Sequence, residues 1–242
     1  EFGLFPVYRA LVLFLFPTRF CRFFFSGLTV DVKIGFSLLI VKEFHLASGT
    51  RIGSFNLIRC ETLDCESHAN ISRRNTIVIS GRLILGNSSS IGNRNKITSP
   101  ICSTVYVNKG EFHLGAKAII TSDHFFDLTD SIVIGENTVI AGKNSEFWTH
   151  SYIHSNYDRF RVDGAIIIGG NSYIGSRSIF LASSGIAGHS HIGAGTIISK
   201  VYKDEDKIII SSRTRVLDFV DNRINMNKIS NTKTCEEVYA KN

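Results

Sequence analysis

The sequence has little proline and little cysteine. Only 3 of its 242 residues are proline, against 20 glycines, so its turns depend on permissive backbone and not on fixed proline corners. Its 5 cysteines form an odd, irregular set without a CxxC pair. This set argues against a disulfide framework or a zinc site and favours reduced structural thiols in a cytoplasmic protein.

Long blocks of like charge are also missing, although the formal net charge is +6. Lysine and arginine are scattered, and no nucleic-acid-binding module is recognisable, which argues against nucleic acid as a partner. The positive charge permits other anionic partners, namely phosphorylated cofactors, nucleotide-sugars, polysaccharides or an acidic membrane face. The net charge alone does not indicate which of these is the partner.

No apolar run is long enough to predict a transmembrane helix. Residues 3–25 are dense in phenylalanine and leucine, but Arg9, Pro17, Arg19 and Arg22 interrupt them before about 20 apolar residues can follow one another. Two alternatives remain open for residues 1–27. One is an interfacial helix in peripheral contact with the inner face of the cytoplasmic membrane, and the other is a helix that caps the first coil of the fold.

An apolar residue recurs at every sixth position in the stretch 166–200. A period of six fits neither a helix face nor a simple alternating strand, and such short repeats are typical of a parallel β-helix. Small polar residues lie four positions after each apolar residue, where a tight corner leaves little space. The apolar positions are Ile168, Ile174, Phe180, Ile186, Ile192 and Ile198, and the polar ones Ser172, Ser178, Ser184, Ser190 and Thr196.

The same spacing, with slips in phase, extends the predicted β-helix over residues 28–220. Slips indicate small insertions at corners, and the interval from Ile140 to Ile168 predicts a loop around residues 150–165. An early phase of Ile34, Ile40, Leu46, Ile52 and Ile58 predicts that coils begin near residue 30. We expect residues 221–242 to form a helical or disordered tail.

This repeat resembles that of the hexapeptide-repeat acyltransferases, and the phrase FWTH, followed by a loop and IIIGGNSYIG, resembles their WbbJ-like sugar O-acetyltransferases. The resemblance implies an all-β, left-handed parallel β-helix with three hexads per coil. It further implies a homotrimer with active sites between subunits and acetyl-CoA as co-substrate, without a metal. The implied reaction is acetyl transfer to a sugar hydroxyl of a surface polysaccharide or its precursor.

The resemblance places the general base at His150. Histidine suits this task because its ordinary pKa near 6.5 lets it accept a proton at neutral pH and return it. His154 is the competing base in the same loop and is a candidate for acceptor binding. His124 and Trp148 are further candidates for acceptor binding, although His124 fits a structural role as well and Trp148 could simply plug the end of the loop.

The resemblance also implies the donor side of the site. The backbone amide of Ser176 matches the family's oxyanion donor, a role for which a rigid N–H is well suited. Tyr173 would line the pantetheine groove, and Ala194 matches a Gly-Ala-Gly corner along that groove. Lys200 and Arg215 match basic positions near the nucleotide end, where both could bind phosphate.

Three alternatives to O-acetyl transfer remain open. The first is an N-acetyltransferase of an amino-sugar nucleotide. The second is zinc chemistry of the γ-carbonic anhydrase kind at His124, His150 and His154. The third is a non-catalytic trimeric scaffold, since one fold serves several functions. The sequence leaves open the acceptor, the hydroxyl and the acyl length.

Overall fold

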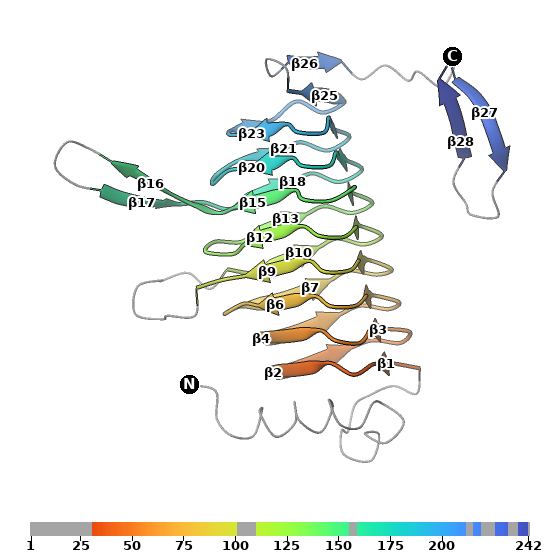
Figure 1. Cartoon of the computed structure of the whole chain (residues 1–242), viewed down its shortest axis with the longest axis vertical. Helices are drawn as coiled ribbons and strands as arrows, with labels where there is room; N and C mark the ends of the chain where they lie inside the picture. The colour runs from red at the N-terminus through yellow and green to blue at the C-terminus, as the bar shows by residue number, and fades with distance from the viewer. Residues whose placement is uncertain are drawn as a thin grey trace.

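The structure is a computed structural model that describes residues 31–100, 110–154, 159–211, 215–218, 226–231 and 237–241. Short parallel strands stack into a column of coils (Figure 1). The predicted all-β, left-handed parallel β-helix is confirmed. The helix expected over residues 1–27 lies outside the described residues. No helix in the described part of the chain is long and apolar enough to cross a membrane.

A ten-stranded sheet forms one face of the column. Its first nine strands are parallel, and β26 adds an antiparallel end. The strands, in sheet order, are β1 (Lys33–Ile34), β3 (Arg51–Ile52), β5 (Asn70–Ile71), β8 (Ser90–Ile91), β11 (Ile119–Ile120), β14 (Val139–Ile140), β19 (Tyr173–Ile174), β22 (His191–Ile192), β25 (Lys207–Ile210) and β26 (Arg215–Asp218).

A second sheet branches at β4 (Leu57–Cys65) and supplies the other two faces. β4 and its partner β2 (Leu38–Leu46) are nine residues each and long enough to run along both. One branch contains β6 (Thr76–Val78), β9 (Lys96–Thr98), β12 (Phe125–Asp127), β15 (Glu146–Trp148), β20 (Ile179–Phe180) and β23 (Ile197–Ile198). The other contains β7 (Arg82–Leu85), β10 (Phe112–Leu114), β13 (Ile132–Ile134), β18 (Ile166–Ile168), β21 (Gly185–Ile186) and β24 (Val201–Tyr202).

The apolar residues of the six-residue repeat form the core. All six predicted between Ile168 and Ile198 are buried. One earlier prediction is wrong, because Ile40 is only half-buried while Leu39 and Val41 take the core positions. The reason is that the corner preceding β2 is one residue shorter than the next, which shifts the alternation of that strand by one position.

Polar residues form a ladder inside one corner of the column. Asn56, Asn75 and Asn95 are each at most 2% exposed, and each side-chain oxygen accepts a backbone N–H of the next coil, at 2.8 to 3.0 Å. His124 and Ser145 continue the ladder, since the Ser145 N–H donates to Nδ1 of His124 at 3.1 Å. These bonds satisfy backbone groups that the tight corner would otherwise bury without a partner.

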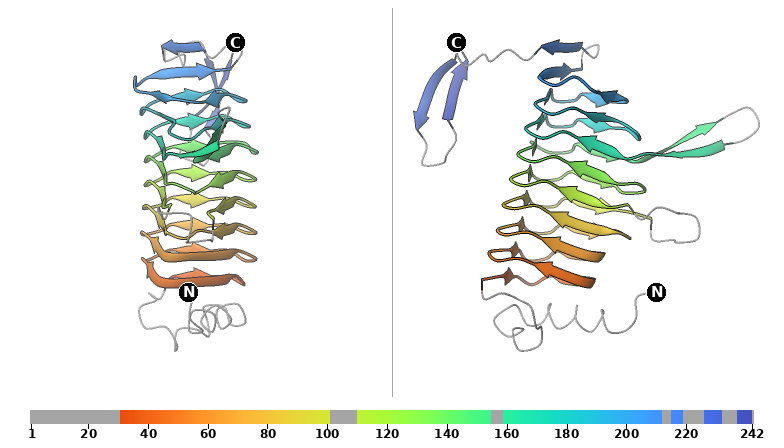
Figure 2. Two further views of the ribbon diagram at one scale, coloured as in Figure 1. Left: turned by 90° about the vertical axis from the view of Figure 1, so that its left-hand side faces the viewer. Right: turned by 180° about the vertical axis from the view of Figure 1, so that it is seen from behind.

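Two insertions interrupt the regular coil length. Most stacked partners lie 17 to 20 residues apart, near three hexads, but Ile91 to Ile120 spans 29 residues and Ile140 to Ile174 spans 34. The second insertion contains the antiparallel hairpin of β16 (His150–His154) and β17 (Arg159–Asp163). Figure 2 shows this hairpin projecting from the column.

The C-terminal tail, residues 221–242, was expected to be helical or disordered. Its described residues form an antiparallel pair of strands, β27 (Met226–Asn231) and β28 (Glu237–Lys241). The segments carry Ile229, Val238 and Tyr239, whose branched or aromatic side chains favour strands. The described residues therefore form strands where a helix was one of the two expected alternatives.

Candidate active site

His150 lies at the base of the β16–β17 hairpin, where the chain leaves the column. It follows the core strand β15 after a single residue, Thr149, and pairs with Asp163 in the hairpin register. The Gly164 N–H donates to the Thr149 carbonyl at 2.9 Å and closes the hairpin base. A rigid coil therefore fixes the backbone on both sides of His150, while 29% of its side chain is exposed.

Asp127, from the neighbouring strand β12, holds the His150 ring. Its Oδ2 atom lies 2.8 Å from Nδ1 of His150, and its side chain is only 10% exposed. An ionised carboxylate can only accept hydrogen bonds, so Nδ1 carries the proton. This assigns the lone pair to Nε2, the nitrogen on the other side of the ring.

Two threonines fix the carboxylate in turn. The Thr149 hydroxyl lies 2.8 Å from the Asp127 carbonyl and 3.1 Å from its Oδ2, and accepts the Asp130 N–H at 2.9 Å. Thr129 is 3% exposed, and its hydroxyl lies 3.1 Å from Nδ1 of His150 and 3.4 Å from Oδ1 of Asp127. Both neighbours restrict the orientation of the acid and, through it, of the imidazole.

Aromatic rings flank His150 on its strand face. Trp148 and Tyr152 meet the imidazole at ring-centroid distances of 6.4 and 6.2 Å, both nearly perpendicular to it. Trp148 also packs against Phe125 at 4.8 Å, and its Nε1–H donates to Glu146 at 3.0 Å. The side chain of Tyr152 remains largely exposed. The arrangement gives the imidazole aromatic walls.

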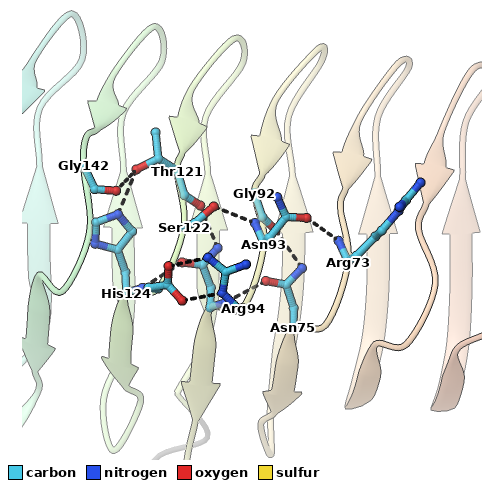
Figure 3. A network of polar contacts seen from close by, with 11 residues as sticks. Arg73, Asn75, Gly92, Asn93, Arg94, Thr121, Ser122, His124 and Gly142 are labelled. Atoms are coloured by element: carbon cyan, nitrogen blue, oxygen red, sulfur yellow. Dashed lines mark hydrogen bonds and ion pairs between the residues drawn. The ribbon is translucent and has the colours of Figure 1, made fainter.

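His124 lies elsewhere, inside the corner ladder (Figure 3). It is 2% exposed, and both ring nitrogens are hydrogen-bonded, Nδ1 to the Ser145 N–H and Nε2 to the Thr121 hydroxyl at 2.9 Å. The hydroxyl of Thr121 also reaches the Gly142 carbonyl at 2.7 Å. Burial lowers the pKa of His124 to about 4, so the ring is neutral. These contacts favour the structural alternative over acceptor binding.

Metal binding by three histidines finds no support in the geometry. Within the described ranges, no three His, Cys, Asp or Glu residues are grouped so that they could hold a metal ion. His124 and His150 direct their Nδ1 atoms to different partners in different parts of the coil. His154 ends β16 and pairs with Arg159 in the hairpin, four positions further along the strand than His150.

The donor-side residues Ser176 and Ala194 lie next to one another at a single corner. The Gly195 N–H donates to the Ser176 carbonyl at 2.9 Å, and the Ser176 hydroxyl donates to the Lys143 carbonyl at 2.9 Å. Gly195 has φ +71°, and a Cβ added to it would meet no atom within 4 Å, so the corner is open. Ser176 lies at the corner before β20, whereas His150 follows the far end of β15, the register partner of β20, so the two lie on neighbouring coils at opposite ends of paired strands.

The remaining predicted residues occupy other positions. Tyr173 is on the outer face of the first sheet and stacks on His191 at 4.8 Å, beside a cavity of about 370 Å³. Lys200 is exposed, with its ammonium 5.3 Å from the Tyr202 ring. Arg215 begins β26 and pairs with Ile210. The structure thus groups Trp148 with His150, and Ser176 with Ala194.

Sequence reasoning missed Asp127, Thr129 and Tyr152. Asp127 pairs in register with Trp148 across 21 residues, and hexad counting does not predict that interval, because the corner at Gly142 is one residue longer than the others. Tyr152 could have been predicted, because Trp148, His150 and Tyr152 are two residues apart and so lie on the same face of an extended strand.

Comparison with known proteins identifies the fold. No protein-family model and no curated protein sequence matches the chain. Among solved structures, the polySia-specific acetyltransferase NeuO superposes with a TM-score of 0.54 at 14% identity, over 79% of this chain and 88% of NeuO. The polysialic acid O-acetyltransferase OatWY gives 0.48 at 15% identity, over 78% of this chain and 88% of OatWY.

A hexapeptide-repeat acetyltransferase of Vibrio cholerae O1 biovar eltor, complexed with acetyl-CoA, gives a TM-score of 0.45 at 16% identity, over 56% of this chain and 70% of that chain. At such identities the similarity describes architecture only. The chain is therefore a left-handed β-helix whose fold is shared by the polySia-specific acetyltransferase NeuO.

Proposed function

We propose that the protein is an acetyl-CoA-dependent O-acetyltransferase that acts on a sugar hydroxyl of a surface polysaccharide or its precursor. The observation that carries this proposal is the His150 and Asp127 pair at the base of the hairpin. It is an accessible imidazole, oriented by a nearly buried carboxylate, on a fold that NeuO uses for acetyl transfer. A histidine oriented in this way is suited to act as a general base.

In the proposed step, Nε2 of His150 accepts the proton of the acceptor hydroxyl. The hydroxyl oxygen forms a bond to the thioester carbonyl carbon, and the carbonyl π electrons move to oxygen. The intermediate then collapses by breaking the carbon–sulfur bond, and the imidazolium returns its proton to the thiolate of CoA. Asp127 remains ionised throughout and stabilises the imidazolium by its hydrogen bond to Nδ1–H.

The oxyanion is assigned to the backbone N–H of Ser176. In the part of the chain that the structure describes, this N–H has no acceptor, which leaves it available for a ligand. Because Ser176 precedes β20 and His150 follows its partner strand β15, the two lie at opposite ends of paired strands, and the proposal requires a second copy of the chain to bring them together. The proposed assembly is a homotrimer with one site at each junction.

The acetyl-CoA site is assigned to the Ser176 and Ala194 corner. Its open space beside Gly195 can accept an extended pantetheine arm. Tyr173 would line this groove, and Lys200 and Arg215 would bind phosphate groups as cations. These residues hold and orient the donor, which itself supplies the activated acetyl group.

The acceptor side is assigned to the aromatic walls beside His150. Trp148 and Tyr152 offer flat apolar surfaces against which the face of a sugar ring can pack. His154 stays a candidate for contact with acceptor hydroxyls. The proposed location is the cytoplasm, with peripheral contact to the inner face of the membrane through residues 3–25, whose apolar and basic composition supports it.

The first test is the thermal stability of the purified protein with and without CoA and acetyl-CoA. A ligand that binds only the folded state raises stability by mass action, so we expect the melting temperature to rise. A panel of glycans and nucleotide-sugars is then screened for CoA release. His150→Ala should abolish release, while His68→Asn, an exposed corner variant with positive φ in an early coil, should retain it. No rise in melting temperature at millimolar ligand, together with no CoA release, would refute the proposal.

A further inference from the structure

Four basic side chains line the first three coils of the column, far from His150 along the chain. Lys33 and Arg51 are direct register partners on β1 and β3 and point outward. Arg73 and Arg74 follow on the next coil, at the corner after β5. All four are exposed, and none of them forms an ion pair with an acidic residue in the described ranges. We call these four residues the basic strip.

The surface between these side chains is hollowed. One cavity of about 280 Å³ is lined by Lys33, Arg51 and Arg73, and a second of about 260 Å³ by Arg73, Arg74 and Phe55. Arg73 belongs to both cavities. The ring of Phe55 is 66% exposed, so an apolar surface lies beside the cations. The strip is therefore a groove with charged and flat apolar walls.

The strip ends where the next corner carries an acid. Arg94, one coil above Arg74, is held by Asp123 through two contacts of 2.7 Å, and this hydrogen bonding holds the pKa of Asp123 below its usual range. Figure 3 shows Arg94 turned into this contact while the Arg73 side chain points away from the network. Asp123 thus neutralises the guanidinium at the corresponding corner of the coil above, and the basic strip ends there.

We propose that the basic strip binds a linear anionic polysaccharide. Neighbouring strands lie about 4.8 Å apart, so a chain lying along the column meets a cation on each of three successive coils. The exposed ring of Phe55 gives a sugar ring a surface for packing. This inference rests on the proposed function in one respect, namely that the bound chain is also the acceptor.

The distance between the basic strip and the candidate base His150 is greater than the length of one sugar residue. Arg74 precedes β6, and His150 follows β15, three strands further along the same face. Three strand steps of about 4.8 Å and six residues of about 3.3 Å place them roughly 20–25 Å apart. A polymer can occupy both places at once, whereas a monosaccharide reaches only one. The linked sites would favour long chains over short ones.

The experiment measures binding of fluorescently labelled polygalacturonate to the purified full chain, with neutral dextran and galacturonic acid as comparison ligands. The double variant Arg73→Gln with Arg74→Asn should bind the polymer roughly tenfold more weakly, as expected for two exposed charge contacts. The control double variant Lys117→Asn with Lys203→Gln removes the same charge at other exposed positions. Lys117 shares the positive φ of Arg74, and the control should bind like the wild type.

A gain of binding provides the complementary test. Asp123→Asn releases Arg94 from its partner and adds a fourth cationic coil, so polymer binding should become tighter, and it should weaken as salt is raised. An equal loss of polygalacturonate affinity in the Arg73/Arg74 variant and the control variant would overturn the inference. Binding of dextran as tightly as polygalacturonate would overturn it as well. Preferential binding to phosphatidylglycerol vesicles over polygalacturonate, lost in the Arg73/Arg74 variant, would assign the strip to a membrane instead and overturn it too.

The experiments test polymer binding by the basic strip and acetyl transfer at His150 independently of one another. The polymer is only a binding ligand, so the strip can be confirmed even when no CoA release is found with any glycan. Conversely, His150→Ala should leave polymer binding unchanged while abolishing acetyl transfer. If acetyl transfer occurs and the double variant Arg73→Gln with Arg74→Asn prefers long acceptors over short ones as strongly as the wild type does, the link between strip and acceptor is wrong.

Discussion

Nδ1 of His150 lies 2.8 Å from Oδ2 of Asp127, and the two residues come from successive coils. The contact therefore exists only because β12 and β15 are stacked in register. It fixes the ring orientation and the tautomer of the candidate base, which are the two properties that a proton-accepting nitrogen needs.

Replacing Asp127 by Asn should lower kcat by about 10²-fold or more with little change in KM, because an amide no longer accepts the Nδ1 proton with a full negative charge. Steady-state kinetics with the acceptor and acetyl-CoA varied in turn measures the effect. Glu136→Gln, an exposed acid in another corner, is the matched control. A variant with the kinetics of the wild type would remove Asp127 from the mechanism.

Trp148→Ala should raise KM for the acceptor about 5- to 30-fold and leave KM for acetyl-CoA unchanged, because it removes one aromatic wall beside His150. Initial rates with each substrate varied in turn separate the two effects. Trp148→Phe keeps a flat ring and should restore most of the affinity. An equal rise in both KM values would point to a general loss of structure.

His124 should make the folding stability depend on pH. Its pKa is about 4 in the fold against 6.5 for the ordinary side chain, so between these values the unfolded chain binds more protons. The contribution of His124 is thus fully present above pH 6.5 and is lost as the pH falls toward 4. Between pH 7.5 and 4.5 the wild type should lose about 2–3 kcal/mol more than His124→Asn.

Urea unfolding at the two pH values measures this difference. Asparagine extends the ladder that Asn56, Asn75 and Asn95 already form, so His124→Asn should fold and retain activity. If the two proteins lose equal stability on acidification, His124 is not buried as a neutral ring. Loss of acetyl transfer by a stable His124→Asn would instead return this residue to the acceptor site.

Asn75→Ala should lower the free energy of unfolding by about 2–4 kcal/mol, because it leaves the Asn95 N–H and the Gly92 carbonyl without their partners in a buried corner. Denaturant unfolding gives the value. Asn87→Ala, an exposed asparagine, should change stability by no more than about 0.5 kcal/mol. Similar values for the two variants would mean that the ladder adds nothing beyond surface hydrogen bonds.

The repeat could be predicted from sequence because its physical requirements are local. The inward positions of the corners carry mostly small polar or amide side chains, and the core needs one apolar residue per face, so Ile168 and Ser172 are recognisable without coordinates. The register between strands of successive coils, by contrast, depends on residues that are far apart in the sequence. The His150 and Asp127 contact depends on the length of the corner at Gly142, where one additional residue shifts the pairing, and no spacing rule predicts it.

The shift at Ile40 has the same origin as the missed contact. Six-residue counting assumes corners of equal length, and the corner before β2 is one residue shorter. The C-terminal strands were missed for another reason. Their residues pair with each other across a five-residue connection, outside the repeat that guided the rest of the prediction.

The corners of the column also bear on how stable this protein could become. Within the described residues, fourteen other than glycine adopt positive φ there, among them Arg177 and His189, and those that are not asparagine or aspartate cost about 1 kcal/mol each relative to glycine in the same conformation. Replacing several of them with glycine or asparagine at corners away from the candidate site offers a route to a thermostable variant. Substitutions at these turns should therefore raise the melting temperature of the protein.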